Sequence, residues 1–180
     1  LLCYVLNISR LKLLTALNEE LDKEQVQKFM EVLGRRSLGE PIAYILGEKE
    51  FFGLTFNVSP DVLIPRPETE LLVDEVLSVL SDNRERNILD LGTGSGCIII
   101  SLANALASAR VRHKFVAVDS SSSALKIAEL NAKKYWVQEK IQFNLSDWFE
   151  IFNPAKDKFD IIISNPPYVD KQKISNTYNI

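Results

Sequence analysis

The residues best suited to chemistry are Asn165, Pro166, Pro167 and Tyr168, which directly follow a short apolar run. Two prolines restrict the backbone, so the Asn165 side chain and the Pro166 carbonyl would be presented as fixed hydrogen-bond acceptors. An NH2 group that donates to both oxygens keeps its lone pair directed outward, toward an electrophile such as a sulfonium methyl group. The same oxygens would bind the nitrogen more strongly as positive charge grows on it, which favours methyl transfer. Tyr168 would pack on a planar acceptor group, whereas the alternative is a turn that only ends a strand.

A second candidate site is the glycine-rich segment after an earlier apolar run. It contains Gly92, Thr93, Gly94, Ser95 and Gly96. Glycines allow positive φ angles and a close approach of the backbone to a ligand. A dinucleotide fold expects its third glycine at position 97, which is Cys97, so the sequence disfavours a nicotinamide oxidoreductase. A ligand without phosphate, such as the methionine part of S-adenosylmethionine, fits this spacing better; a purely structural tight turn is the alternative.

Two carboxylates and one aromatic residue complete the candidate site. Asp119 ends an apolar run about 25 residues beyond the glycine turn, which is the position where a ribose diol is held. Asp147 follows the next apolar run, where its carboxylate would accept from an adenine amine, and Trp148 would cover the ring. Alternatively, Asp119 caps the next helix and Trp148 belongs to the core.

The order of apolar segments from residue 87 onward indicates how these side chains are positioned. Strands are expected at 88–91, 115–118, 141–143 and 159–163, and helices at 98–106 and 122–135. Strands that alternate with helices predict a mostly parallel sheet with right-handed crossovers, which is a Rossmann-like α/β fold. Ligands bind such sheets at the carboxyl ends of the strands, and every candidate residue follows a strand.

The first 46 residues are expected to be helical. Asp22 and Gln25 have the spacing of a capping box. The apolar residues that follow at positions i, i+3, i+4 and i+7 share one helical face and are Val26, Phe29, Met30 and Leu33. Gly34 and Gly39 are expected to end this helix.

Residues 50–58 are aromatic and β-branched around a central glycine, which predicts a short β-hairpin. Three prolines then stiffen a connector. Pro67 suits the first turn of a helix that is expected to run to about Ser81.

The composition disfavours several classes of site and partner. The chain has 180 residues, a net charge of −3, one histidine and two cysteines far apart. These numbers disfavour a metal site, a disulfide framework and a large nucleic-acid partner. His113 is expected at the edge of a strand. The sequence has neither a signal peptide nor an apolar run of membrane-spanning length, which favours a cytoplasmic protein.

Together with Asn165 to Tyr168, three further segments resemble the HemK/PrmC family. They are residues 39–47 (GEPIAYILG), 50–54 (EFFGL) and 63–70 (LIPRPETE). This family methylates the glutamine amide in the Gly-Gly-Gln motif of class 1 peptide-chain release factors, with S-adenosylmethionine as methyl donor. Two alternatives are a nucleic-acid adenine or guanine N-methyltransferase, which shares the Asn-Pro-Pro-Tyr motif, and a non-catalytic cofactor-binding protein.

The resemblance implies a class I methyltransferase domain at 67–180, preceded by a helical substrate-recognition domain at 1–46 and a hairpin linker at 47–66. It assigns residues 92–96, Asp119, Trp148 and Asn165 to the cofactor, and residues 165–168 to the substrate glutamine. Arg66 and Glu68 would lie near the site or serve only as helix-start charges. The family's domain continues beyond residue 180, so the sequence is expected to lack further strands and helices.

Overall fold

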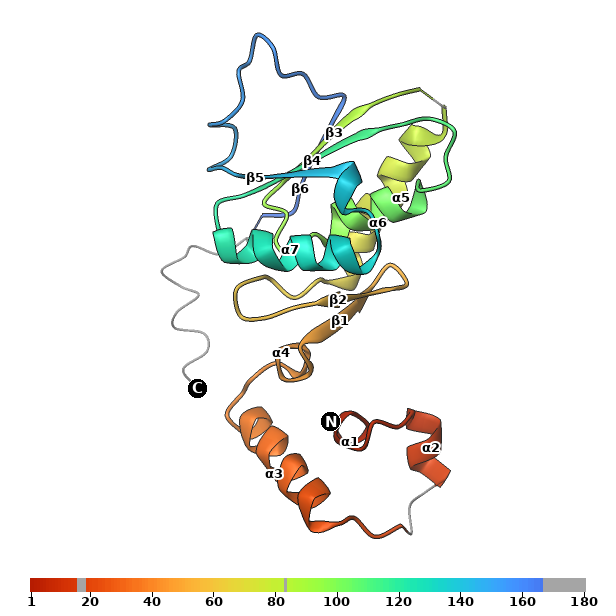
Figure 1. Cartoon of the computed structure of the whole chain (residues 1–180), viewed down its shortest axis with the longest axis vertical. Helices are drawn as coiled ribbons and strands as arrows, with labels where there is room; N and C mark the ends of the chain where they lie inside the picture. The colour runs from red at the N-terminus through yellow and green to blue at the C-terminus, as the bar shows by residue number, and fades with distance from the viewer. Residues whose placement is uncertain (16–18, 83, 167–180) are drawn as a thin grey trace. The chain divides into compact units, whose positions relative to one another are not determined.

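The computed structural model describes residues 1–15, 19–82 and 84–166. Two compact units can be separated in the chain, one over Leu1–Gly47 and one that begins at Glu48 (Figure 1). Pro167 and Tyr168, two of the candidate site residues, lie outside the described residues. The boundaries 1–46, 47–66 and 67–180 stay a prediction.

The first unit is helical, as the sequence predicts. Its helices are α1 (Leu2–Leu6), α2 (Arg10–Thr15), α3 (Lys23–Ser37) and α4 (Ile42–Leu46). The capping box of α3 is formed, because Asp22 Oδ1 accepts from the Gln25 amide at 2.8 Å and Gln25 Oε1 accepts from the Asp22 amide at 3.0 Å. These two bonds satisfy amide groups that would otherwise lack a partner at the start of the helix.

The end of α3 differs from the expectation, because the helix runs through Gly34 to Ser37. The Ser37 hydroxyl donates to the Gly34 carbonyl at 2.7 Å, and the Glu40 amide bonds the Arg35 carbonyl at 3.3 Å. These local bonds outweigh the cost of a glycine within the helix, about 1 kcal/mol. Gly39, at a φ of 89°, follows the helix end.

The second unit begins with the predicted hairpin, in which β1 (Glu48–Phe51) pairs antiparallel with β2 (Leu54–Asn57). Phe52 and Gly53 form its two-residue turn with φ angles of 51° and 70°. Two positive φ angles in succession are typical of the type I′ turn, whose twist matches that of the strands.

Four parallel strands form the main sheet, which confirms the predicted Rossmann-like class. They are β3 (Asn87–Leu91), β4 (Lys114–Asp119), β5 (Ile141–Leu145) and β6 (Ile161–Ser164), in the order β5-β4-β3-β6. In sequence order, β4 and β5 are added on one side of β3, and β6 then pairs with the other side of β3 (Figure 1). The point where the strand order reverses therefore lies between β3 and β6, where such folds bind their ligands.

Helices cover one face of this sheet. Those of the second unit are η1 (Pro67–Thr69), α5 (Glu70–Val79), η2 (Leu80–Asp82), α6 (Cys97–Ala105), α7 (Ser122–Lys134) and η3 (Gln138–Lys140). Ile88, Phe115 and Ile163 of the sheet pack with α5, α6 and α7 in one buried cluster. Phe51 and Phe56 of the hairpin are buried in the same cluster, so the hairpin shares the core of this unit.

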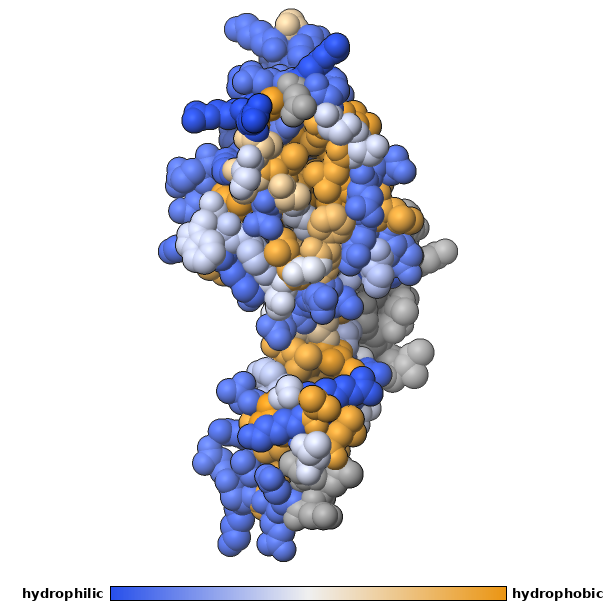
Figure 2. All heavy atoms as spheres, turned by 90° about the vertical axis from the view of Figure 1, so that its right-hand side faces the viewer, coloured by the Kyte–Doolittle hydropathy of each residue, from blue (hydrophilic) through white to orange (hydrophobic). Residues whose placement is uncertain are grey.

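The opposite face of the sheet has a smaller cluster, in which Leu89, Leu91 and Val118 contact Phe152 and Phe159. Within the described residues this face keeps exposed apolar side chains, among them Ile162, which is 52% exposed. Apolar side chains also gather at the surface in the space-filling view, with hydrophilic side chains around them (Figure 2).

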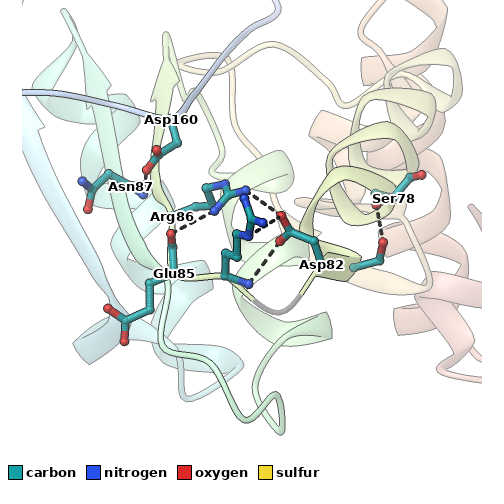
Figure 3. A network of polar contacts seen from close by, with 8 residues as sticks. Ser78, Asp82, Glu85, Arg86, Asn87 and Asp160 are labelled. Carbon is teal, nitrogen blue, oxygen red and sulfur yellow. Dashed lines mark hydrogen bonds and ion pairs between the residues drawn. The ribbon is translucent and has the colours of Figure 1, made fainter.

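Polar contacts tie the strands together at the amino edge of the sheet (Figure 3). The Asn87 amide donates to Asp160 Oδ2 at 2.7 Å, and the Asp160 amide donates to the Asn87 carbonyl at 2.9 Å. Arg86 forms an ion pair with Asp82 at 2.7 Å. His113 lies directly before β4, and its pKa is lowered by burial and by the charge of Arg86. These contacts lie at the edge opposite the candidate site, so we assign them a role in stability.

Asp160→Ala should lower the free energy of unfolding by about 1 kcal/mol, because it removes the acceptor of the Asn87 amide. Urea denaturation measures this difference. Asp74→Ala, which removes an exposed carboxylate on α5, is the matched control and should leave the free energy of unfolding nearly unchanged. Equal stabilities of the two variants would show that the contact contributes nothing.

Candidate functional site

Strand register brings the candidate segments to one edge of the sheet. Leu91 of β3 pairs with Ser164 of β6 and with Val118 of β4. The Ser164 hydroxyl also donates to the Leu91 carbonyl at 2.9 Å, which fixes the last residues of β3 and β6 side by side. Gly92 and Asn165 are the next residues along the two strands, so the glycine turn and the asparagine corner begin next to each other.

The glycine turn is held by β4. The amides of Gly92 and Thr93 both donate to the Val118 carbonyl at 2.9 Å. Gly92 and Gly94 have φ angles of 70° and 56°, and a Cβ atom built at either one would meet no atom of the described residues within 4 Å, apart from its own chain neighbours. Their backbone is therefore open on one side, as a loop that approaches a ligand must be.

Gly96 has a different reason for being glycine. Its φ is 79°, and a Cβ atom there would lie 2.6 Å from Ile100 Cδ1 and 3.2 Å from Ala128 Cβ. Gly96 therefore allows α6 to start close to α7, which is a packing role.

The side chains of Thr93 and Ser95 are buried, at 5% and 2% exposure. The Thr93 hydroxyl donates to Asp90 Oδ2 at 2.7 Å, so it is directed into the protein. Their part in cofactor binding, as predicted from the sequence, would therefore fall to their backbone atoms.

Asn131 of α7 is a residue of this region that the sequence analysis missed. It is fully buried, and its Nδ2 donates to the Ser95 carbonyl at 2.8 Å and to the Asn57 carbonyl at 3.0 Å. Its Oδ1 accepts from the Asn57 amide at 2.7 Å. One side chain thus joins the glycine turn to the hairpin. The sequence signal that could have indicated a buried role for Asn131 is its position with Ala128 and Ala132 on the apolar face of the predicted helix.

Asp119 ends β4 beside the glycine turn. Its Oδ2 accepts from the Gly94 amide at 2.8 Å, and its Oδ1 accepts from the Ser121 amide at 2.9 Å. The N-cap of α7 is Ser121, whose hydroxyl accepts from the Ala124 amide at 3.2 Å. Asp119 is therefore not the helix cap, and this alternative from the sequence is wrong. Each of its half-buried oxygens retains a further lone pair, because a carboxylate has about four acceptor positions.

Asp90 is an almost fully buried carboxylate beneath the glycine turn, at 1% exposure. Its Oδ1 makes no hydrogen bond of normal geometry within the described part of the chain. Burial raises its pKa to about 6, the bond from Thr93 opposes this rise, and the charge of Asp119 adds to it. Burial also raises the pKa of the nearby Cys97 thiol to about 12, so this thiol is neutral and no nucleophile.

Asp147 and Trp148 follow β5 at the same edge, where the Ser146 amide bonds the Asp119 carbonyl at 3.0 Å. Both side chains are exposed, Trp148 to 53%, so the alternative of an ordinary core residue is wrong for Trp148. Its φ of 49° is unusual for a bulky side chain and costs on the order of 1 kcal/mol. The Ser146 hydroxyl, which donates to the Trp148 carbonyl at 3.2 Å, supports this conformation.

Asn165 lies at the carboxyl end of β6, and its Nδ2 donates to the Thr69 hydroxyl of η1 at 2.9 Å. The Nδ2 end of the Asn165 amide therefore lies toward η1, and the Oδ1 end lies on the other side of Cγ. Pro166 is half-buried, and Arg66 and Glu68 at the start of η1 are exposed.

Two further observations concern the described residues only. No three His, Cys, Asp or Glu side chains among them lie close enough to share a metal ion. No described helix is long and apolar enough to span a membrane.

Family models match two parts of the chain. The model described as "Methyltransferase small domain" matches residues 68–179, and the "PrmC N-terminal domain" matches residues 1–47. A crystal structure of a SAM-dependent methyltransferase from Agrobacterium tumefaciens superposes with a TM-score of 0.53 at 19% identity, over 67% of this chain and 39% of that one. This likeness supports the fold.

The chain is also similar to proteins named "Release factor glutamine methyltransferase". The protein from Buchnera aphidicola subsp. Schizaphis graminum is 45% identical over 98% of this chain, and that from Burkholderia pseudomallei is 42% identical over 94%. A "Bifunctional methyltransferase" from Rickettsia prowazekii is 43% identical over 94% of this chain. The chain spans 61%, 59% and 35% of the length of these three relatives.

Proposed function

Because the chain belongs to the methyltransferase small domain family, we propose that it is the cofactor-binding part of a release factor glutamine methyltransferase. The reaction would place a methyl group from S-adenosylmethionine on the side-chain nitrogen of the glutamine in a Gly-Gly-Gln motif. The observation that carries the proposal is the position of Asn165 beside the glycine turn, where paired strands β3 and β6 end.

The open carboxyl edge of the sheet has the right chemistry for S-adenosylmethionine. The backbone at Gly92 and Gly94 suits the methionine part, because no side chain in the described part of the chain lies where a Cβ of either glycine would meet it. The Asp119 carboxylate, held by two backbone amides, would accept from the ribose hydroxyls. Asp147 would accept from the adenine amine, and the exposed ring of Trp148 would cover the base. When bound, S-adenosylmethionine supplies an electrophilic methyl group on a positively charged sulfur.

For the acceptor glutamine, the Asn165 side-chain oxygen and the Pro166 carbonyl would accept the two amide hydrogens. This arrangement directs the nitrogen lone pair outward and excludes other orientations of the amide. An amide nitrogen is a poor nucleophile, and positive charge grows on it as it gains the methyl group. Fixed oxygen dipoles stabilise that charge more than they stabilise the neutral amide, so they lower the barrier. Pro167 and Tyr168 would complete the binding of the planar amide.

The expected partner is a class 1 peptide-chain release factor, and the helices of the first unit would help to bind it. This partner would place the reaction in the cytoplasm, where translation terminates. The relatives' names do not favour methylation of a nucleic acid, and the net charge of −3 provides little attraction for phosphate groups.

The test is transfer of a labelled methyl group by the full-length protein. We expect label on a release factor with the Gly-Gly-Gln motif and none when its glutamine is changed to alanine. A duplex DNA that contains adenine is the control acceptor and should stay unlabelled. Label that persists after the glutamine is removed would contradict the substrate, and label on DNA would favour the nucleic-acid alternative.

A further inference from the structure

We infer that Thr69 is a positioning residue of the proposed methyl transfer, because its hydroxyl bonds the Asn165 side-chain amide and holds it in place at the carboxyl end of β6. The inference rests on the proposed function. Thr69 and Asn165 are 96 positions apart in the sequence, and the bond from Asn165 Nδ2 to the Thr69 hydroxyl is 2.9 Å long. Thr69 is 7% exposed, so water competes little for this bond.

The side chain of Thr69 is not used to cap a helix. Thr69 is the last residue of η1, which runs directly into α5, and its φ and ψ of −72° and −17° are helical. Its hydroxyl makes no capping bond to α5. The hydroxyl is instead used by Asn165. Helix stability therefore does not explain this threonine.

The neighbouring residue fixes the place of the hydroxyl. Glu70 Oε1 accepts from the Phe52 amide in the hairpin turn at 3.0 Å. The hairpin is in turn bound to α7, because Asn131 bonds both Asn57 and Ser95. The start of α5 is thus anchored to a buried part of the unit that also holds the glycine turn.

The orientation of the Asn165 amide decides whether it can serve the reaction. A glutamine NH2 group donates, so it needs the oxygen of Asn165 and is repelled by its nitrogen. A half-turn about the Asn165 Cβ–Cγ bond exchanges the two ends. A threonine hydroxyl both donates and accepts, so the bond to Thr69 restrains the rotation of the amide group and does not by itself select its end. Without the hydroxyl this restraint is lost, and the Asn165 oxygen spends less time in the position that meets the glutamine NH2 group.

Thr69→Val, which keeps the shape and removes the hydroxyl, should lower kcat for release factor methylation by about tenfold, the loss expected for one hydrogen bond. The KM for S-adenosylmethionine should change less than twofold, because the glycine turn and Asp119 are untouched. Thr69→Ser, which restores the acceptor, should recover most of the rate. Thr55→Val removes a threonine hydroxyl in β2 and is the matched control, with an expected rate equal to that of the wild type.

The outcomes separate this inference from the proposed function. A wild-type protein that methylates no release factor would overturn both. A wild-type protein that is active, together with an equally active and folded Thr69→Val, would overturn only the role of Thr69. A failure of Thr69→Ser to recover the rate would do the same. If Thr69→Val lowers the melting temperature by more than a few degrees, Thr69→Cys is the second variant. Its thiol is a weaker hydrogen-bonding group than a hydroxyl, so its kcat should lie between those of Thr69→Val and the wild type. A wild-type kcat for Thr69→Cys would contradict the inference.

Discussion

Asn165→Ala is expected to lower the rate of glutamine methylation at least a hundredfold, with only a small change in the affinity for S-adenosylhomocysteine. The loss is large because the variant removes a fixed acceptor that orients the amide and stabilises the charge that grows on its nitrogen. Removal of one preorganised dipole from an active site typically costs about a hundredfold to a thousandfold in rate. Single-turnover methyl transfer measures the rate, and calorimetry measures the affinity.

Asn104→Ala is the matched control for this variant. Asn104 lies in α6, is half-buried and has no part in the proposed site, so its replacement should leave the rate nearly unchanged. A loss of cofactor affinity as large as the loss of rate would show that Asn165 serves mainly the cofactor. A wild-type rate for Asn165→Ala would remove the basis of the proposed mechanism.

Asp90 should make the protein more stable at mildly acidic pH, opposite to the behaviour of a carboxylate in an ion pair. Its pKa in the folded protein is about 6, above the value of 3.8 for an exposed aspartate, so the folded state binds the proton more tightly. The contribution to stability is therefore complete below the lower pKa and is lost as the pH rises through 6. Between pH 8 and pH 4.5 the folded state should gain about 2 kcal/mol from this group.

The comparison with Asp90→Asn isolates this contribution, because other carboxylates titrate in the same range. Glu40, for example, has a lowered pKa owing to its hydrogen bonds from Arg35, which acts in the opposite direction. Urea denaturation of both proteins should give a difference, wild type minus variant, that rises as the pH falls from 8 to 4.5. Asp74→Asn, on the exposed surface of α5, is the control for the replacement of an aspartate by asparagine. A difference that is flat or falls with decreasing pH would contradict the assignment.

The sheet was predictable because short segments rich in apolar residues alternate with helical segments. The three isoleucines at 161–163, for example, indicate a strand, and right-handed crossovers then favour the parallel order. The glycine turn, Asp119 and Asn165 follow three of these runs, so their meeting at one edge of the sheet followed from topology alone.

The features that sequence analysis missed depend on contacts between distant residues. Nothing in the segment around Thr69 indicates that its hydroxyl bonds Asn165 instead of capping α5, because that choice depends on the position of β6. Gly34 was expected to end α3, yet bonds in the following turn extend the helix.

The most direct test of the account is a crystal structure of the full-length protein with S-adenosylhomocysteine and a glutamine-containing peptide from a release factor. We expect the sulfur beside the backbone of Gly92 and Gly94, and the peptide amide bonded to the Asn165 oxygen with its nitrogen directed at the sulfur. A cofactor bound elsewhere, or an Asn165 side chain directed away from the sulfur, would contradict the proposed function.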